Sequence, residues 1–149
     1  NETRRVIHDM ANLTLIKHGL VAQVQELVES IQSANMIDVN LKVEGIENRL
    51  DKRVEAKVYK IVQELISNTL KYSDASTLNI EIENLHQELT LKISDNGIGF
   101  DTQEARKSPS SGLGLMSVRE RVKDLGGEIK IQAAKGKGTT ISIDKIHLN

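Results

Sequence analysis

Apolar residues recur at helical spacing in four stretches of the chain, the first of which is only partly periodic. The longest stretch places Val58, Ile61 and Leu65 on one stripe and contains no Gly or Pro to break a helix. Gly19 and the pair Gly126-Gly127 are typical helix stops. Helices are therefore predicted over about residues 2–17, 20–35, 53–72 and 113–125.

In the intervening stretches apolar and polar residues alternate, which is the pattern of a strand with one buried face. Strands are predicted around residues 37–43, 78–82, 89–93, 128–133 and 139–146, with the second and third joined as a hairpin through the polar stretch 84–88. The order of elements is helix, helix, strand, helix, strand, strand, helix, strand, strand. This order favours an α+β fold, in which a mixed sheet of about five strands carries helices on one face.

The stretch from Asn96 to Gly112 lacks either pattern. It is rich in glycine and serine and contains the single proline of the chain, Pro109. A loop of this length inside a compact domain usually has a function, and we expect it to be mobile.

Composition narrows the class of protein. The chain has 149 residues, a formal net charge of -1 and no cysteine. This length suits one globular domain, and the absence of a basic stripe excludes nucleic acid as an expected partner. Without cysteine there is no disulfide framework or thiolate zinc site, so a reducing compartment is permitted. No apolar run approaches the ~20 residues of a membrane helix, and we expect no direct membrane contact.

Asp95 is the most informative residue of the chain. It ends a predicted strand in which Leu89, Leu91 and Ile93 alternate with polar residues, so its carboxylate is predicted to point into the core. Burying a carboxylate costs several kcal/mol unless it finds a partner. The glycines that follow Asp95 leave room for close approach to the backbone, and a ligand with a hydrogen-bond donor, such as an adenine amino group, would satisfy the acid.

Three polar residues lie at the edge of the longest predicted helix. Glu64, Asn68 and Lys71 are spaced i, i+4 and i+7, and Asn68 falls at the border of the apolar stripe. Polar groups at such a border can face a cleft, but on spacing alone an ordinary solvated helix edge is favoured. Tyr72, one turn past Asn68, fits equally well beside a bound base or in the core.

Two glycine-rich segments are candidates for binding phosphate. One precedes the predicted helix 113–125, whose first turn offers unpaired backbone N–H groups, and it comprises Gly112, Leu113, Gly114 and Leu115. The other, residues 136–140, resembles a P-loop only superficially and is better explained as a hairpin turn between two strands. Neither meets an established nucleotide-binding fingerprint by itself.

The histidines do not suggest a metal centre. They are scattered without the spacing of metal ligands, and we expect them to be solvated or helix-edge residues: His8, His18, His86 and His147.

Taken together and in order, four segments resemble the boxes of the GHKL ATPases, and within them the catalytic and ATP-binding domain of bacterial sensor histidine kinases. Residues 63–73 (QELISNTLKYS) resemble the N box, residues 95–100 (DNGIGF) the G1 box, residues 112–115 (GLGL) the G2 box and residues 136–139 (GKGT) the last glycine box. The resemblance covers about residues 19–146.

A finer resemblance comes from the segment that follows the G2 box. Residues 114–121 (GLMSVRER) and 125–127 (LGG) are similar to the subfamily that includes the nitrate and membrane-fluidity sensors. Tyr72 departs from that subfamily, which most often has His there. The resemblance implies a two-layer α/β sandwich of the Bergerat type.

The resemblance implies a role for each residue near the base. Asp95 would accept the adenine amino group, Thr139 would approach the adenine through its hydroxyl or a water, and Tyr72 would line the nucleotide site. Gly97 and Gly99 would let the loop close on the base.

It also implies a phosphate and metal site that uses ATP and Mg²⁺. Asn68 would hold Mg²⁺ between the phosphates, and Glu64 would position or deprotonate a group near the metal, which makes these two the implied catalytic residues. Lys71 would meet phosphate as a point charge, and residues 100–111 would form an ATP lid. The phosphates would be cradled by Gly112, Leu113, Gly114 and Leu115.

The resemblance also bears on partners and domain organisation. The implied partners are a dimerisation and phosphoacceptor domain of the same protein and a response regulator, with the kinase at the cytoplasmic end of a membrane-bound sensor. His8-Asp9 matches the dipeptide at the phosphoacceptor site, but only about ten residues separate it from Gly19, too few for the acceptor hairpin. We therefore expect residues 1–18 to be the end of the dimerisation and phosphotransfer helix and residues 19–149 to be the catalytic domain.

Two other functions stay open on the sequence. One is a nucleotide-binding module that has lost catalysis and docks a partner, and the other is a serine kinase of the anti-sigma-factor type on the same fold. Intact Glu64, Asn68 and Asp95 argue against a dead site.

Overall fold

The computed structural model describes residues 19–47, 49–99 and 115–148. A first helix covers residues 19–33. The elements that follow are β1 (Asp38–Glu44), α2 (Lys52–Asn68), η1 (Thr69–Ser73), β2 (Thr77–Leu85), β3 (Glu88–Asp95), α4 (Leu115–Asp124), β4 (Glu128–Ala133) and β5 (Thr139–His147). The predicted helix over residues 2–17 and the predicted lid, residues 100–111, lie outside the described residues.

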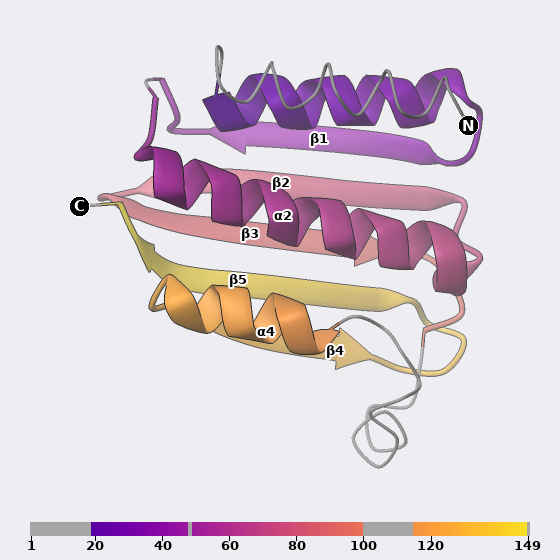
Figure 1. The fold of residues 1–149 in the computed structure, drawn as a ribbon. Coiled ribbons are helices and arrows are strands. Elements are labelled where there is room, and N and C mark those ends of the chain that lie inside the picture. The colour runs from indigo at the N-terminus through magenta and orange to yellow at the C-terminus, as the bar shows by residue number, and fades with distance from the viewer. Residues whose placement is uncertain (1–18, 48, 100–114, 149) are drawn as a thin grey trace.

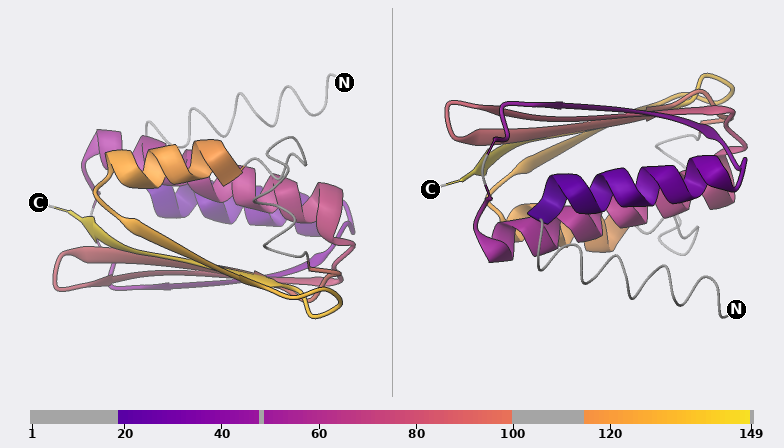
Figure 2. Two further views of the ribbon diagram at one scale, coloured as in Figure 1. Left: turned by 90° about the horizontal axis from the view of Figure 1, so that it is seen from below. Right: turned by 90° about the horizontal axis from the view of Figure 1, so that it is seen from above.

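The strands form a mixed sheet in the order β1-β2-β3-β5-β4. β1 pairs with β2 in parallel, with α2 as the crossover between them, whereas the other neighbouring pairs are antiparallel. In the described part of the chain the helices pack on one face of this sheet, which gives two layers (Figures 1 and 2). The predicted α+β sandwich with a mixed five-stranded sheet is confirmed.

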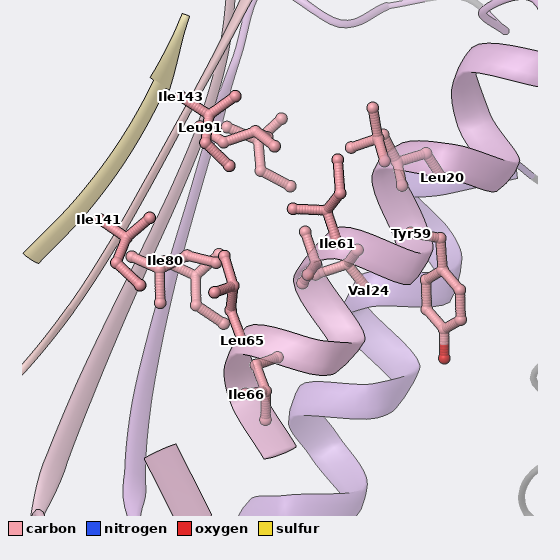
Figure 3. Close-up of a cluster of buried hydrophobic side chains, with 14 of the residues drawn as sticks. Leu20, Val24, Tyr59, Ile61, Leu65, Ile66, Ile80, Leu91, Ile141 and Ile143 are labelled. Carbon is pink, nitrogen blue, oxygen red and sulfur yellow. The ribbon is translucent and has the colours of Figure 1, made fainter. Parts of the chain in front are cut away.

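The core lies between the helical layer and the sheet. The stripes predicted on the first helix and on α2 are buried, and they face the inward side chains of the central strands (Figure 3). Leu65 and Ile61 of α2 are 2% and 0% exposed, and Leu91 of β3 is 1% exposed. Because the ends of α2 and β3 both emerge from this core, their polar terminal residues are fixed relative to one another.

The β2–β3 hairpin is tighter than the sequence suggested. We expected residues 84–88 to form the connection, but the strands continue to Leu85 and Glu88 and leave a turn of two residues. His86 and Gln87 have φ angles of 54° and 62°. Positive φ at both turn positions matches the right-handed twist of the strands, and Asn-Gly usually supplies it. The prediction missed this turn because neither residue is a typical turn former.

The helix predicted over residues 53–72 changes its hydrogen bonding near its end. The α-helical part ends at Asn68, and Thr69 to Ser73 form a π-helical turn. Within it the hydroxyl of Thr69 donates to the Leu65 carbonyl oxygen at 3.1 Å, and the hydroxyl of Ser73 donates to the Thr69 carbonyl oxygen at 2.6 Å. Such side-chain bonds to the preceding turn distort helices, and π-helical turns often occur at functional sites.

A buried carboxylate joins the start of the first helix to the start of α2. Glu55 is 3% exposed and accepts hydrogen bonds from the Nε and Nη2 of Arg49 at 3.1 and 2.8 Å and from the backbone amides of Leu20 and Leu50 at 3.2 and 3.4 Å. Burial alone would raise the pKa of Glu55, but the Arg49 guanidinium and the two amides outweigh it and hold the pKa below its ordinary value. We call this group of residues the Glu55 clasp.

Candidate functional site

Asp95 lies at the end of β3, on the face that carries Leu91 and Ile93. Its Oδ1 accepts the backbone N–H of Gly97 at 2.8 Å. Asp95 was predicted to point into the core, but it is half-buried rather than enclosed by the core. Half-burial at a strand end leaves the acid within reach of both the core and solvent.

Asn96 fixes the backbone just after this acid. Its side-chain oxygen accepts the backbone N–H groups of Ser76 and Thr77, both at 2.9 Å, and its Nδ2 donates to the Ser76 hydroxyl at 2.8 Å. The loop that leaves β3 is thus tied to the turn that enters β2. Sequence reasoning did not assign Asn96 a role.

Gly97 and Gly99 of this loop lie where neighbouring backbone segments leave no room for a Cβ atom. A Cβ on Gly97 would overlap the carbonyl oxygen of Ser73, and the next residue, Ile98, donates its backbone N–H to the same oxygen at 2.7 Å. Gly99 has a φ of +64°, and a Cβ there would overlap the carbonyl oxygen of Ala134. The group that approaches these glycines in the structure is therefore the chain's own backbone.

The last glycine segment closes against the same loop. A Cβ on Gly138 would overlap the carbonyl oxygen of Asp95, and the backbone N–H of Gly136 donates to the Ile98 carbonyl oxygen. Thr139 begins β5 and stands directly opposite Asp95 in the sheet. Residues 134–138 connect β4 to β5 and include Gly136 and Gly138, so the hairpin turn predicted for these glycines is confirmed. The segments that resemble the G1 and last glycine boxes thus meet at one end of the sheet.

The residues of the N-box-like segment lie along the end of α2 and in η1. Glu64 and Asn68 are half-buried, and Lys71 is exposed. Tyr72 is 48% exposed, which rules out the core position that the sequence left open and keeps its ring available beside a ligand. The Ser73 carbonyl oxygen accepts the backbone N–H of Ile98 in the loop after β3. This segment and Asp95 therefore lie at the same end of the domain.

Glu64 is not the solvated helix-edge residue that its spacing alone favoured. Its Oε2 accepts the Ser117 hydroxyl at 2.8 Å, and its Oε1 accepts Nη1 of Arg121 at 2.5 Å. Both partners belong to α4. Sequence reasoning missed Ser117 and Arg121 as site residues, although the motif quoted for the subfamily contains them. Their i, i+4 spacing on a helix beside the buried Val118 and Val122 was the available signal.

The remaining predicted residues belong to the segment before α4. Gly112, Leu113 and Gly114 lie outside the described residues, and Leu115 is the first residue of α4 and packs partly buried against the core.

The described residues contain no group of three His, Cys, Asp or Glu side chains that would hold a metal ion. Mg²⁺ in a nucleotide site is usually held by one or two side chains together with substrate phosphates and waters. The side-chain oxygen of Asn68 suits that coordination.

In the described ranges no helix is both long and apolar enough to cross a membrane.

Comparison with known proteins decides the family. The family model described as "Histidine kinase-, DNA gyrase B-, and HSP90-like ATPase" matches residues 53–149. The chain belongs to this ATPase family. The matched range contains all four segments whose motifs resembled the GHKL boxes.

Curated relatives extend the similarity over nearly the whole chain. The protein is 34% identical over 142 residues to the signal transduction histidine-protein kinase/phosphatase DegS of Brevibacillus brevis, covering 95% of this chain and 36% of the relative. It is 31% identical to the sensor histidine kinases ComP and LiaS of Bacillus subtilis, covering 95% and 96% of this chain but 18% and 38% of those proteins. The chain thus spans well under half the length of these relatives.

Solved structures support the fold. The Acinetobacter baumannii histidine kinase AdeS superposes with a TM-score of 0.66 at 24% identity, covering 98% of this chain and 78% of that one. The histidine kinase domain of the blue-light activated kinase of Erythrobacter litoralis EL346 gives a TM-score of 0.67 at 22% identity, covering 87% and 61%.

Proposed function

We propose that this chain is the catalytic and ATP-binding domain of a sensor histidine kinase, in which ATP donates its γ-phosphoryl group to a histidine on a separate dimerisation domain. The observation that carries the proposal is the half-buried Asp95 carboxylate, fixed at a strand end where the glycine-containing segments 97–99 and 136–138 meet. The family match and the kinase names of the curated relatives support it.

In this proposal Asp95 accepts the adenine amino group through Oδ2, and Thr139, its neighbour in the sheet, approaches the base from β5. Gly97 and Gly99 are required because backbone segments crowd this end of the sheet, which fixes the position of the acid before a ligand arrives. The ring of Tyr72 covers one side of the nucleotide.

At the phosphate end, Asn68 contributes its amide oxygen to Mg²⁺, Lys71 meets a phosphate oxygen, and residues 112–115 donate backbone N–H groups to the phosphates. The metal, when bound, neutralises phosphate charge. The bond between the γ-phosphorus and the bridging oxygen breaks, a bond forms from phosphorus to an imidazole nitrogen, ADP leaves, and the imidazole loses a proton. Glu64 positions or deprotonates a group near the metal. Such a transfer needs mainly positioning and charge neutralisation.

Three finer statements belong to the same proposal. The segment 114–121 supports membership of the subfamily that includes the nitrate and membrane-fluidity sensors. Residues 1–18 are proposed as the end of the dimerisation helix, and residues 19–149 as the catalytic domain. The whole protein is proposed to work at the cytoplasmic face of a membrane and to pass its phosphoryl group to a response regulator.

A thermal melt tests nucleotide binding. Ligand at 100 times its dissociation constant stabilises the folded state by about 2.7 kcal/mol, which corresponds to a shift of roughly 5–11 °C for a domain of this size. We expect this shift with millimolar Mg-ATP and a much smaller one with Mg²⁺ alone. Equal melting temperatures under the two conditions would show that the proposed site is wrong.

Calorimetric titration of two variants separates base recognition from metal binding. Asp95→Asn should weaken ATP and ADP alike, because it removes a charge-assisted hydrogen bond worth about 1.5–3 kcal/mol, whereas Asn68→Ala should mainly remove the Mg²⁺ dependence of ATP binding. Asp144→Asn is the control, since Asp144 is also half-buried but lies opposite Glu128 near the far end of β5. Equal losses for the two site variants with and without Mg²⁺ would contradict the separate roles.

Phosphoryl transfer is tested with γ-labelled ATP. The chain incubated alone with Mg-ATP should acquire no acid-labile label, whereas a protein that also contains the dimerisation domain should. Label on the isolated chain that is lost in His8→Gln would identify His8 as the acceptor and overturn the proposed division of the chain at Gly19.

A further inference from the structure

Helix α4 lies beside α2 and is linked to it by polar contacts at two levels. Near the end of α2 the Glu64 carboxylate meets Ser117 and Arg121, and seven residues earlier Lys57 pairs with Asp124 at 3.5 Å. Because higher residue numbers on α2 meet lower ones on α4, the two helices run antiparallel. The two helices lie side by side in Figure 1, and the edge-on views show them on the same face of the sheet (Figure 2).

The two links differ in character. Asp124 is 60% exposed and pairs with Lys57 through one long contact, an arrangement that contributes little. Glu64 and Arg121 are 29% and 31% exposed, and each oxygen of the carboxylate has its own donor. Two donors that arrive from separate side chains fix both the position and the rotation of a carboxylate, which one contact does not.

The contacts of Glu64 with Ser117 and Arg121 lie next to the proposed metal and phosphate sites. Glu64 lies one helical turn before Asn68, the proposed magnesium ligand. The orientation of the Glu64 carboxylate therefore determines which group near the metal it can contact. Leu115 is the last residue of the proposed phosphate-binding segment and the first residue of α4. Ser117 and Arg121 follow within two turns, so one rigid helix connects the phosphate segment to Glu64.

We propose that Arg121, assisted by Ser117, is a positioning residue that holds the Glu64 carboxylate in the orientation used for phosphoryl transfer. This inference rests on the proposed function. It assigns no contact with nucleotide to Arg121, which acts through Glu64. It differs from a purely structural role, because the core anchors of α4 are Val118 and Val122, which are 0% and 1% exposed.

The test is a double-mutant cycle in the full-length protein that contains this chain, with kcat and KM for phosphoryl transfer from Mg-ATP and the Mg-ATP dissociation constant from calorimetry. Loss of a general acid or base lowers rates by about 100-fold or more, and loss of a supporting partner by about tenfold. We therefore expect Glu64→Gln to lower kcat about 100-fold and Arg121→Ala about tenfold, with KM and the dissociation constant within about twofold of wild type. In Glu64→Gln, adding Arg121→Ala should change kcat no further.

Companion variants keep the test sharp. Arg121→Lys retains the charge but not the planar fork and should recover part of the lost kcat, and Ser117→Ala should lose less than Arg121→Ala. Arg119→Ala removes an exposed cation from the same helix, and Asp124→Asn breaks the other link between the helices. Both controls should have wild-type kcat. If Arg121→Ala unfolds at the assay temperature, Arg121→Lys and Ser117→Ala carry the comparison.

The outcomes are distinct. Wild-type kcat in Arg121→Ala, an increase in kcat, or losses that multiply in the double variant would overturn the positioning role while leaving the proposed function intact. An equal loss of kcat in Asp124→Asn would show that only helix docking matters. No transfer of label by the wild-type protein would instead refute the proposed function. Wild-type kcat in Glu64→Gln would remove the role of Glu64 and the inference with it.

Discussion

Replacing Glu55 with glutamine keeps the shape of the side chain and removes its charge at the Glu55 clasp. The glutamine amide retains one acceptor oxygen and turns an NH₂ group toward either Arg49 or the amides of Leu20 and Leu50, so at least one side of the clasp loses its acceptor. Each hydrogen bond to a charged group contributes about 1.5–3 kcal/mol, and breaking a buried ion pair costs about 3–5 kcal/mol. The Arg49 side chain is 42% exposed, so water replaces part of what it loses.

We therefore expect Glu55→Gln to lower the free energy of unfolding by about 2–3 kcal/mol at pH 7, and the melting temperature by about 4–12 °C. The folded-state pKa of Glu55 is lowered, because Arg49 and two amides outweigh the effect of burial. A lowered pKa stabilises the fold above the ordinary carboxyl pKa, and this contribution is lost as pH falls through the folded-state value. The difference between wild type and Glu55→Gln should thus shrink below about pH 4.

Urea denaturation of both proteins from pH 7 down to pH 3 measures this difference. Glu44→Gln is the matched control, since Glu44 pairs with Lys42 on the surface, where the two side chains are 54% and 64% exposed. Such a pair contributes about 0–1 kcal/mol. Equal losses in Glu55→Gln and Glu44→Gln, or a Glu55→Gln loss that stays constant into acid, would refute this account of the clasp.

Two further predictions test the backbone. Gly97→Ala should lower stability by more than about 2 kcal/mol in a thermal melt, because its methyl would overlap the Ser73 carbonyl oxygen, whereas Gly126→Ala, with φ +75° and open space around it, should cost only about 1 kcal/mol; similar losses would show that steric overlap is not the cause. Gln87→Gly should stabilise the protein by up to about 1 kcal/mol, since a residue with φ 62° in the turn with His86 would no longer be disfavoured, and a lower melting temperature would contradict this.

The elements of the fold were predictable because their patterns are local. The stripe on α2 and the alternation in β3 each follow from the requirement to bury one face, and both hold in the structure. The π-helical turn after Asn68 was not predicted, because it depends on hydroxyl groups of Thr69 and Ser73 that suit an ordinary helix equally well in the sequence. The two-residue turn at His86 was missed because its sequence does not favour a turn, and the pairing of β2 with β3 imposes the turn on it.

The candidate site was predictable only where one segment carries its own signal. Asp95 could be predicted from its position at the end of a strand with alternating apolar and polar residues. Glu64 did not, because the contacts that distinguish it from a solvated residue come from Ser117 and Arg121, far away in sequence. Glu55 was missed in the same way, since nothing in α2 alone shows that Arg49 and the first helix will enclose its carboxylate.

The strand order has a consequence for how the protein folds. β2 and β3 are neighbours in sequence joined by a two-residue turn, and such hairpins form within microseconds. The central β3–β5 pair joins residues far apart in the chain, such as Asp95 and Thr139, and closing a long loop before the contacts form makes such pairing slow. Because that pair brings the two proposed base-recognising residues together, we expect the nucleotide pocket to be among the last parts of the molecule to assemble, after the helices and the hairpin.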